Sequence, residues 1–458
     1  MRDIHVSAII DAVKKLCIDA NLELEPDMLR AFDRALTSER SAAGKQVLQI
    51  LKDNAEMAKT RRIPYCQDTG FVVCFVELGQ DVHVTGGGLD DAINEGVRQG
   101  YREGYLRASI VRSPFDRVNT GDNTPAVIHV DIVAGATLRL MIMAKGGGCE
   151  NRSKYTMLTP AEGAAGVKDW IIECVRTAGP DACPPLIVGV GVGGTFEKAA
   201  ILSKRALFRE LGSPNPDSTL DALEQELLER ANRLGIGPQG YGGDTTAPAG
   251  IAWGREWGHS LGLVASVVKS GADGVKEVGP PLSDGDVESL RAGDRVRITG
   301  VLYTARDAAH GRLFPLIEKG ESLPIDVRGQ IIYYTGPSPA RPGEIVGSIG
   351  PTTGGRMDKF TPALLRLGLK ATMGKGARSQ PVKDALRQHK GVYFGAIGGA
   401  GAVLSRFVKR VEIVAYEDLG TEAIRRLEVE NFPAIVVNDC HGGDLYQDGM
   451  RAYAREET

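Results

Sequence analysis

Three cysteines stand in loop-like runs of this sequence and are the residues best suited to chemistry. Cys66 opens the run CQDTG before an apolar stretch, Cys149 ends the run KGGGC after another, and Cys183 opens CPPLIVGVGVGGTFEKAA. They lack the paired Cys-x-x-Cys spacing of zinc sites, yet three thiolates from separate loops could hold a cubic iron–sulfur cluster. Such a cluster would leave one iron open as a Lewis acid that helps a hydroxyl group depart as water. For Cys66, a half-buried thiol beside an Asx-type turn at Asp68 is an equally good interpretation of the local sequence.

Glycine runs adjoin two of these cysteines. The backbone amides of Gly146, Gly147 and Gly148 could receive an anion, or the glycines could only supply positive φ in a tight turn. The run from Gly189 to Gly194 breaks the Gly-x-Gly-x-x-Gly spacing of a dinucleotide site, and no acidic residue closes a second strand about 20 residues later. We therefore exclude a dinucleotide-binding fold.

Cations follow three predicted strands in the second half of the chain. Arg306 lies in TARDAAH, Arg356 in GPTTGGRMD and Lys375 in MGKG. A guanidinium group matches a carboxylate in two-point geometry, so these residues together would suit a substrate with two carboxylates. For any one arginine, a surface salt bridge is the more common alternative.

Apolar spacing predicts the elements that position these residues, and their mixture gives an α/β (mixed α+β) fold. The breaker-rich stretch at 279–286 separates two regions, which we place at 1–278 and 279–458. In the first region we expect three helices within residues 1–60, further helices near 90–103, 161–174, 196–211 and 219–233, and strands at 71–76, 126–133, 138–143, 186–192 and 261–268. In the second we expect strands at 295–304, 330–334, 370–373, 392–395 and 434–438, and helices near 306–317, 358–367 and 422–429.

Composition excludes several classes of protein. The 458 residues are 42% hydrophobic with a formal net charge of -3, which gives no basic field for a nucleic acid. No apolar run approaches the ~18 residues that span a bilayer, and the first residues lack the pattern of a secretory signal. Seven cysteines spread through a long chain do not indicate a disulfide framework. We expect a cytoplasmic protein that binds neither nucleic acid nor membrane.

Seven motifs in order resemble the class I fumarases and L-tartrate dehydratases over nearly the whole chain. They are CQDTG, KGGG, CPPLIVGVGVGGTFEKAA, GIGPQGYGG, TARDAAH, GPTTGGRMD and MGKG. Residues 1–278 resemble the α part of that family, a larger cluster-binding α/β region. Residues 279–458 resemble its β part, a smaller, swivelling α/β domain. The two parts are separate polypeptides in some members and are fused here.

The resemblance implies a homodimer with a 4Fe-4S cluster that reversibly hydrates a small unsaturated dicarboxylate, with fumarate to malate the first expectation. By motif, Cys66 and Cys183 match cluster ligands, and Thr352 matches the base, for which we expect Asp68 as partner because a threonine hydroxyl is a very weak base alone. The positions that match substrate-binding residues are Gln67, Arg112, Gly147, Arg306, Arg356 and Lys375.

The chain departs from the family pattern at its third cluster cysteine. That residue is expected shortly after GIGPQGYGG, but residues 263–270 contain no cysteine. Cys149 stands where the family typically has serine, and Asp244 replaces a lysine. We expect that the third ligand has moved to Cys149, and the alternative is an altered cluster.

Two other functions remain open. One is a dehydratase of the same family for tartrate or another 2-hydroxy dicarboxylate. The other is a cluster-binding or ligand-sensing relative without turnover, which the missing cysteine permits. The presence of Arg306, Thr352, Arg356 and Lys375 together disfavours the second.

Overall fold

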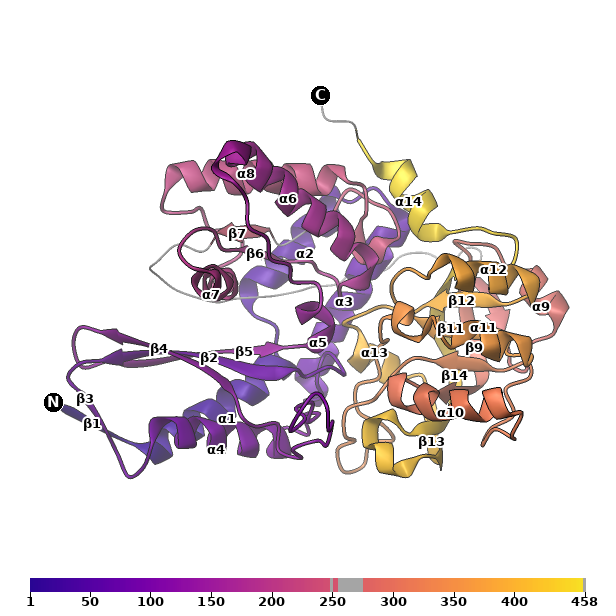
Figure 1. Ribbon diagram of the computed structural model, residues 1–458, viewed down its shortest axis with the longest axis horizontal. Coiled ribbons are helices and arrows are strands. Elements are labelled where there is room, and N and C mark those ends of the chain that lie inside the picture. The colour runs from indigo at the N-terminus through magenta and orange to yellow at the C-terminus, as the bar shows by residue number, and fades with distance from the viewer. Residues whose placement is uncertain (248–249, 254–274, 456–458) are drawn as a thin grey trace.

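The structure is a computed structural model that describes residues 1–247, 250–253 and 275–455 (Figure 1). Its α-helices are α1 (Val6–Leu22), α2 (Pro26–Ser38), α3 (Ala42–Arg61), α4 (Leu89–Glu103), α5 (Gly147–Glu150), α6 (Gly163–Ala178), α7 (Phe196–Ala206), α8 (Ser218–Arg233), α9 (Asp284–Glu288), α10 (Asp307–Lys319), α11 (Thr361–Arg366), α12 (Gln380–Gln388), α13 (Gly401–Ser405) and α14 (Leu445–Tyr453). Its 3-10 helices are η1 (Pro160–Glu162), η2 (Gly179–Asp181), η3 (Pro238–Gly240), η4 (Gly354–Met357) and η5 (Glu417–Glu422).

The strands are β1 (Arg2–His5), β2 (Phe71–Gly79), β3 (Val82–Thr85), β4 (Val127–Val133), β5 (Leu138–Lys145), β6 (Val188–Val190), β7 (Ile251–Trp253), β8 (Val275–Val278), β9 (Arg295–Thr304), β10 (Ile331–Tyr333), β11 (Ala371–Gly374), β12 (Val392–Gly395), β13 (Val408–Ala415) and β14 (Ile424–Asn438). None of the described helices has the length and apolar character needed to cross a bilayer.

The N-terminal region is built on small sheets. The strand β2 lies at the centre of a three-stranded sheet, parallel to β4 and antiparallel to β5. Alternate residues of β2, such as Val72 and Val76, pack with Ile9 and Val13 of α1 and Ile93 of α4, because successive strand side chains point to opposite faces. Separate two-stranded sheets pair β1 with β3 and β6 with β7. The second of these packs with α6 and α8 in its own apolar cluster.

The C-terminal region is built on one seven-stranded sheet in the order β13-β14-β12-β11-β10-β9-β8. The long strand β14 also pairs with β9, so the sheet closes on itself. Apolar side chains from these strands, including Ile298, Tyr333, Phe394 and Val436, form one buried cluster. A closed sheet of this kind fixes strand register on both edges.

A further cluster of buried apolar side chains contains residues from both regions and so joins them. Phe32 of α2 and Leu48 of α3 belong to the same apolar core as Leu313 of α10 and Leu364 of α11. The Asn54 amide, also on α3, donates to the Gly399 carbonyl at 2.8 Å. In Figure 1, α3 runs between the two regions, and α14 lies above the C-terminal sheet beside the N-terminal helices. A side chain at Gly242 would collide with the Gly449 backbone of α14.

The expected α/β class is confirmed, and most expected elements lie within a few residues of the observed ones. The helix expected near 422–429 is wrong, because those residues belong to β14. Ile424 and Leu427 imitate helical spacing, but the strand pairs with β13 on one side and β9 on the other. The strand expected at 261–268 lies outside the described residues, and β13 was not expected. The C-terminal sheet begins at β8, a few residues before the expected boundary at 279.

Candidate active site

Three thiols converge where loops of the N-terminal region meet the C-terminal sheet. Cys66 lies between α3 and β2, Cys149 lies in α5 directly after β5, and Cys183 follows η2. The Cys183 thiol lies close enough to the Cys66 and Cys149 thiols to shift the pKa of each. The Lys375 ammonium, which follows β11, donates to the Cys183 sulfur at 3.0 Å and to the Asp181 carbonyl at 2.8 Å.

The surrounding groups set the proton affinities of these side chains. The hydrogen bond from Cys183 lowers the pKa of Cys66, whereas the hydrogen bond with Cys183, together with burial, raises the pKa of Cys149. Burial disfavours the Lys375 ammonium, but the nearby Cys183 and Cys149 thiols outweigh burial and raise its pKa. Lys375 is therefore a permanent positive charge beside the thiols.

The absence of a side chain at Gly398 allows the chain to pass close to Cys183 and Lys375. A Cβ atom on Gly398 would lie 3.2 Å from the Cys183 sulfur and 3.0 Å from Cδ of Lys375. The Gly398 amide donates to the Gln239 side chain at 2.7 Å, which ties the GIGPQGYGG loop to the same place.

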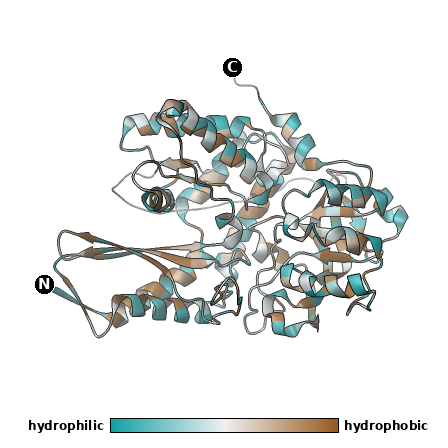
Figure 2. Cartoon of the chain, viewed as in Figure 1, coloured by the Kyte–Doolittle hydropathy of each residue, from teal (hydrophilic) through white to brown (hydrophobic). Residues whose placement is uncertain are grey.

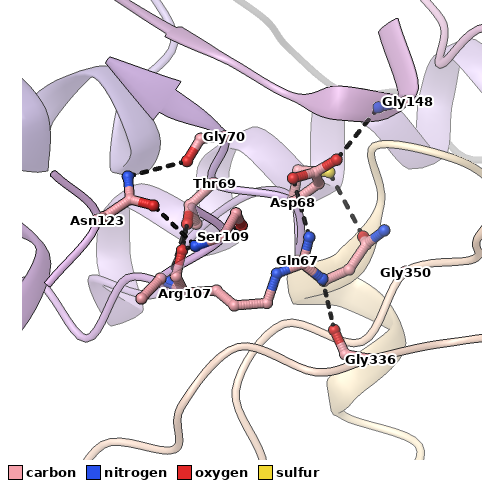
Figure 3. Close-up of polar contacts among 12 residues, drawn as sticks. Gln67, Asp68, Thr69, Gly70, Arg107, Ser109, Asn123, Gly148, Gly336 and Gly350 are labelled. Carbon is pink, nitrogen blue, oxygen red and sulfur yellow. Dashed lines mark hydrogen bonds and ion pairs between the residues drawn. The ribbon is translucent and has the colours of Figure 1, made fainter. Parts of the chain in front are cut away.

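Asp68 lies beside the thiols and is held by two groups of the N-terminal region, one of which also reaches the C-terminal region (Figure 3). Its carboxylate accepts from the Arg107 guanidinium at 2.9 Å and from the Gly148 amide at 3.4 Å. Arg107 also donates to the Gly336 carbonyl of the C-terminal region at 2.9 Å. Burial raises the pKa of Asp68, but Arg107, the Gly148 amide and Arg306 outweigh it, so the net shift is downward and the carboxylate is ionised at neutral pH.

Two further arginines of the C-terminal region lie near this pair. Arg306 is 9% exposed, and its guanidinium is 3.4 Å from the Glu422 carboxylate. Its buried Nε makes no hydrogen bond within the described residues. Arg356 forms a two-point pair with Asp307, at 2.9 and 2.7 Å. Burial lowers the pKa of Arg306, and the positive charges of Arg107 and Arg356 lower it further, so one small region concentrates cationic groups.

Gln67 reaches across the boundary between the regions to Gly350 and Pro351, the two residues that precede Thr352. The Gln67 amide donates to the Pro351 carbonyl at 3.4 Å, and a Cβ at Gly350 would collide with the Gln67 side chain (Figure 3). Thr352 is buried, and its amide donates to the Tyr334 carbonyl just beyond β10 at 2.7 Å. Gly147 begins α5, and a Cβ there would meet no described atom within 4 Å.

Arg112 lies apart from this group. Its side chain is exposed, and its backbone amide pairs with Val118 in the loop between α4 and β4. The buried arginine of the same loop is Arg107, which the sequence analysis missed. Both arginines stand in the run LRASIVR, and no periodicity in that run distinguishes them. The expected partner of Asp68 was Thr352, whereas the structure pairs Asp68 with Arg107.

The donor set suits an iron–sulfur cluster better than a single ion. Among residues 1–247, 250–253 and 275–455, no group of three or more histidine, cysteine, aspartate or glutamate side chains is arranged to hold a metal ion. In a cluster, thiolates bind different irons, so they need not surround one point. Cys66, Cys149 and Cys183 come from three loops to one place, which fits a cluster, and Lys375 would offset its negative charge.

Comparison with known proteins identifies relatives along both regions. The family model described as fumarate hydratase matches residues 10–251, and the model described as the fumarase C-terminus matches residues 274–449. The anaerobic class I fumarate hydratase of Escherichia coli is 34% identical over 93% of this chain and 91% of its own length. Fumarate hydratase 2 of Leishmania major is 31% identical over 92% of this chain and 83% of its own.

A third relative covers only the N-terminal region. The putative L(+)-tartrate dehydratase subunit alpha of Methanocaldococcus jannaschii is 36% identical over 52% of this chain and 86% of its own length. The two matched family models divide the chain between residues 251 and 274, which agrees with β8 belonging to the C-terminal sheet.

Proposed function

Because this chain belongs to the class I fumarate hydratase family, we propose that it is an iron–sulfur hydro-lyase that reversibly adds water to fumarate to form malate. The observation that supports this most directly is the meeting of three thiols, the ionised Asp68 and the cations Arg107, Arg306 and Lys375 at one boundary between the regions. Thiols suit a cluster, and guanidinium groups suit a dicarboxylate.

In this proposal a 4Fe-4S cluster is held by Cys66 and Cys183 together with a third thiolate. When bound, it supplies an open iron that acts as a Lewis acid toward the hydroxyl group of the substrate. The protein must then bind two carboxylates, orient them and move one proton.

We infer that Arg306 and Arg356 bind the substrate carboxylates, because a planar guanidinium matches a carboxylate and Arg306 lies near both Arg356 and the Arg107 that holds Asp68. The buried Nε of Arg306 has no hydrogen-bond partner in the described residues, so it can donate to a substrate carboxylate without first breaking a hydrogen bond of its own. Arg356 is paired with Asp307, which orients its guanidinium. We assign Gln67 and Gly147 as further substrate contacts, because Gln67 adjoins Cys66 and Asp68 and Gly147 adjoins the Gly148 amide that donates to Asp68.

Proton transfer falls to Thr352 and Asp68. Asp68 is ionised, and Arg107 and the Gly148 amide hold its carboxylate in position. Thr352 is fixed by backbone bonds to the C-terminal sheet, so its hydroxyl can be presented in one place. A positioned acid–base group contributes about 10²–10⁴-fold to a rate.

An anaerobic assay tests the proposal. Protein reconstituted with iron, sulfide and thiol should convert fumarate to malate, measured by loss of fumarate absorbance, and should be inactivated by oxygen. Activity that survives prolonged aerobic handling with a chelator would contradict the cluster. A panel of fumarate, malate, tartrate and mesaconate then identifies the substrate. Turnover of tartrate alone would establish the dehydratase alternative that the Methanocaldococcus relative suggests.

The proposal includes a homodimer in the cytoplasm. β4 is an edge strand of its sheet, which is coloured largely hydrophobic in Figure 2. Its side chains Val127, Val130 and Ile132 are exposed, the last at 70%. An exposed apolar edge of this kind is a site for association. Light scattering should give twice the mass of the chain, and Ile132→Ser should shift it toward one copy. The seven free cysteines agree with a reducing compartment.

A further inference from the structure

All seven cysteines of the chain lie within the described residues, so every thiol available to a cluster can be placed. Cys17 and Cys74 are buried in the apolar core between α1 and β2, where burial raises the pKa of each to about 12. Cys174 lies on α6 and Cys440 lies beside His441 near α9, and neither contacts the thiols of the site. Only Cys66, Cys149 and Cys183 lie together.

Within that group, Cys183 is the central thiol. It interacts with both Cys66 and Cys149, and its sulfur accepts a hydrogen bond from the Lys375 ammonium at 3.0 Å. Cys66 and Cys149 therefore both lie next to Cys183. The Lys375 ammonium is the counter-charge for all three thiols.

The loop that presents Cys149 also reaches the proposed catalytic carboxylate. Gly148 donates its amide to Asp68, and Cys149 is the next residue in the short helix α5. A Cβ on Gly148 would meet only Nζ of Lys375, at 3.9 Å. One turn of backbone therefore places a thiol toward Cys183 and an amide toward Asp68.

We propose that Cys149 is the third protein ligand of the cluster, so that this chain binds it through Cys66, Cys149 and Cys183. This rests on the proposed function, because it assumes that a cluster is bound. The ligand replaces the one that relatives of this chain are expected to supply after GIGPQGYGG, a segment that has no cysteine here. The exchange would attach the cluster to the loop whose Gly148 amide donates to Asp68.

Thiol protection in the unmodified protein tests the ligand set directly. Loaded and cluster-free protein are treated anaerobically with iodoacetamide, and each cysteine is quantified by peptide mass spectrometry. Cys66, Cys149 and Cys183 should react at least about tenfold more slowly in loaded protein, because a ligated thiolate is no longer free to attack. Cys174 should react equally in both. Protection of Cys66 and Cys183 without protection of Cys149 would overturn the inference.

Substitution gives a second, independent readout. Wild type should hold about four irons and four sulfides per chain after reconstitution. Cys149→Ala should hold less than half of this and lose the broad visible absorption, whereas Cys174→Ala should match wild type. Circular dichroism establishes that both variants are folded. Wild-type iron content and spectrum in Cys149→Ala would also overturn the inference.

The outcomes separate the two proposals. If wild type hydrates fumarate and binds a cluster that Cys149→Ala retains, only the third ligand is wrong. If wild type takes up no iron or sulfide, the iron–sulfur function itself is wrong.

Discussion

The two halves of the site are attached to different kinds of scaffold. In the C-terminal half, Thr352 and Lys375 follow strands of one closed sheet, and backbone hydrogen bonds at 2.7 and 3.1 Å connect Thr352 to Tyr334 and Lys375 to Thr352. In the N-terminal half, Cys66, Cys149 and Cys183 come from loops around small separate sheets. The cations are therefore fixed by the sheet, whereas the thiols are fixed by one another and by Lys375.

This difference in scaffold predicts how amino-acid substitutions in each half should affect catalysis. A substitution in the closed sheet alters one donor while the backbone stays in place. A substitution among the loops removes a contact that holds several residues, since Asp68, Gly148 and Arg107 are linked by two hydrogen bonds. Catalysis should thus be most sensitive on the loop side.

The largest effect is expected for Asp68→Asn. Asparagine keeps the size of the side chain but cannot accept a proton, so kcat should fall by about 10²–10⁴-fold. Anaerobic steady-state kinetics measure this, with circular dichroism as the check on folding. A loss of less than tenfold would show that the ionised carboxylate of the loop side is not part of the reaction.

A smaller effect is expected for Arg107→Ala, which removes the link between Asp68 and the C-terminal Gly336 carbonyl. Leaving a mostly buried carboxylate without its partner should lower the free energy of unfolding by about 3 kcal/mol and kcat/KM by about tenfold or more. Arg112→Ala in the same loop is the matched control and should change stability by at most about 0.5 kcal/mol. If the two variants lose equal stability and activity, Arg107 is not more important than Arg112, and the sequence-based assignment of Arg112 to the site stands.

Arg356→Lys tests the closed-sheet side. Lysine keeps the positive charge but loses the two-point fork toward Asp307 and toward a carboxylate, so kcat/KM should fall by about tenfold with little change in stability. Arg328→Lys is the control, because Arg328 forms a similar pair with Asp326 on the surface. Unchanged kinetics in Arg356→Lys would make Arg356 a surface residue too.

The smallest effect is expected for the pH dependence of His310 in the C-terminal half. Burial lowers its pKa from 6.5 to about 4, and its ring packs against Phe360 and Tyr334. As the pH falls below 6.5, His310 binds a proton in the unfolded chain but not yet in the folded protein. The free energy of unfolding should therefore fall by about 2 kcal/mol between pH 7 and pH 5. Urea unfolding of wild type and His310→Gln at both pH values should show this loss only in wild type.

The exposed His83, near the N-terminus, provides the control for that comparison. The His83→Gln variant should retain the pH dependence of wild type. If His310→Gln also retains it, the buried imidazole does not contribute to the acid sensitivity of the C-terminal half.

The spacing of apolar residues along the sequence predicted most helices and strands, because amphipathic helices such as α1 and strands such as β9 have regular apolar spacing. It failed for β14, where the apolar residues Ile424 and Leu427 have helical spacing but two neighbouring strands determine the conformation. The sequence also identified Cys66, Asp68 and Lys375 as neighbours through their motifs. It did not identify Arg107, because burial of one arginine and exposure of another five residues away depend on contacts with Gly336, more than 200 residues distant.

The apolar core shared by α2, α3, α10 and α11 has a consequence for how the chain melts. Phe32 and Leu48 would expose apolar surface if the C-terminal region unfolded alone, and Leu313 and Leu364 would do so in the reverse case. Unfolding of either region would therefore destabilise the other. The helix α14 adds a further connection, because Gly449 packs against Gly242. Calorimetry should record a single cooperative transition, with equal van't Hoff and calorimetric enthalpies. We therefore expect the N-terminal and C-terminal regions to unfold together as one cooperative unit.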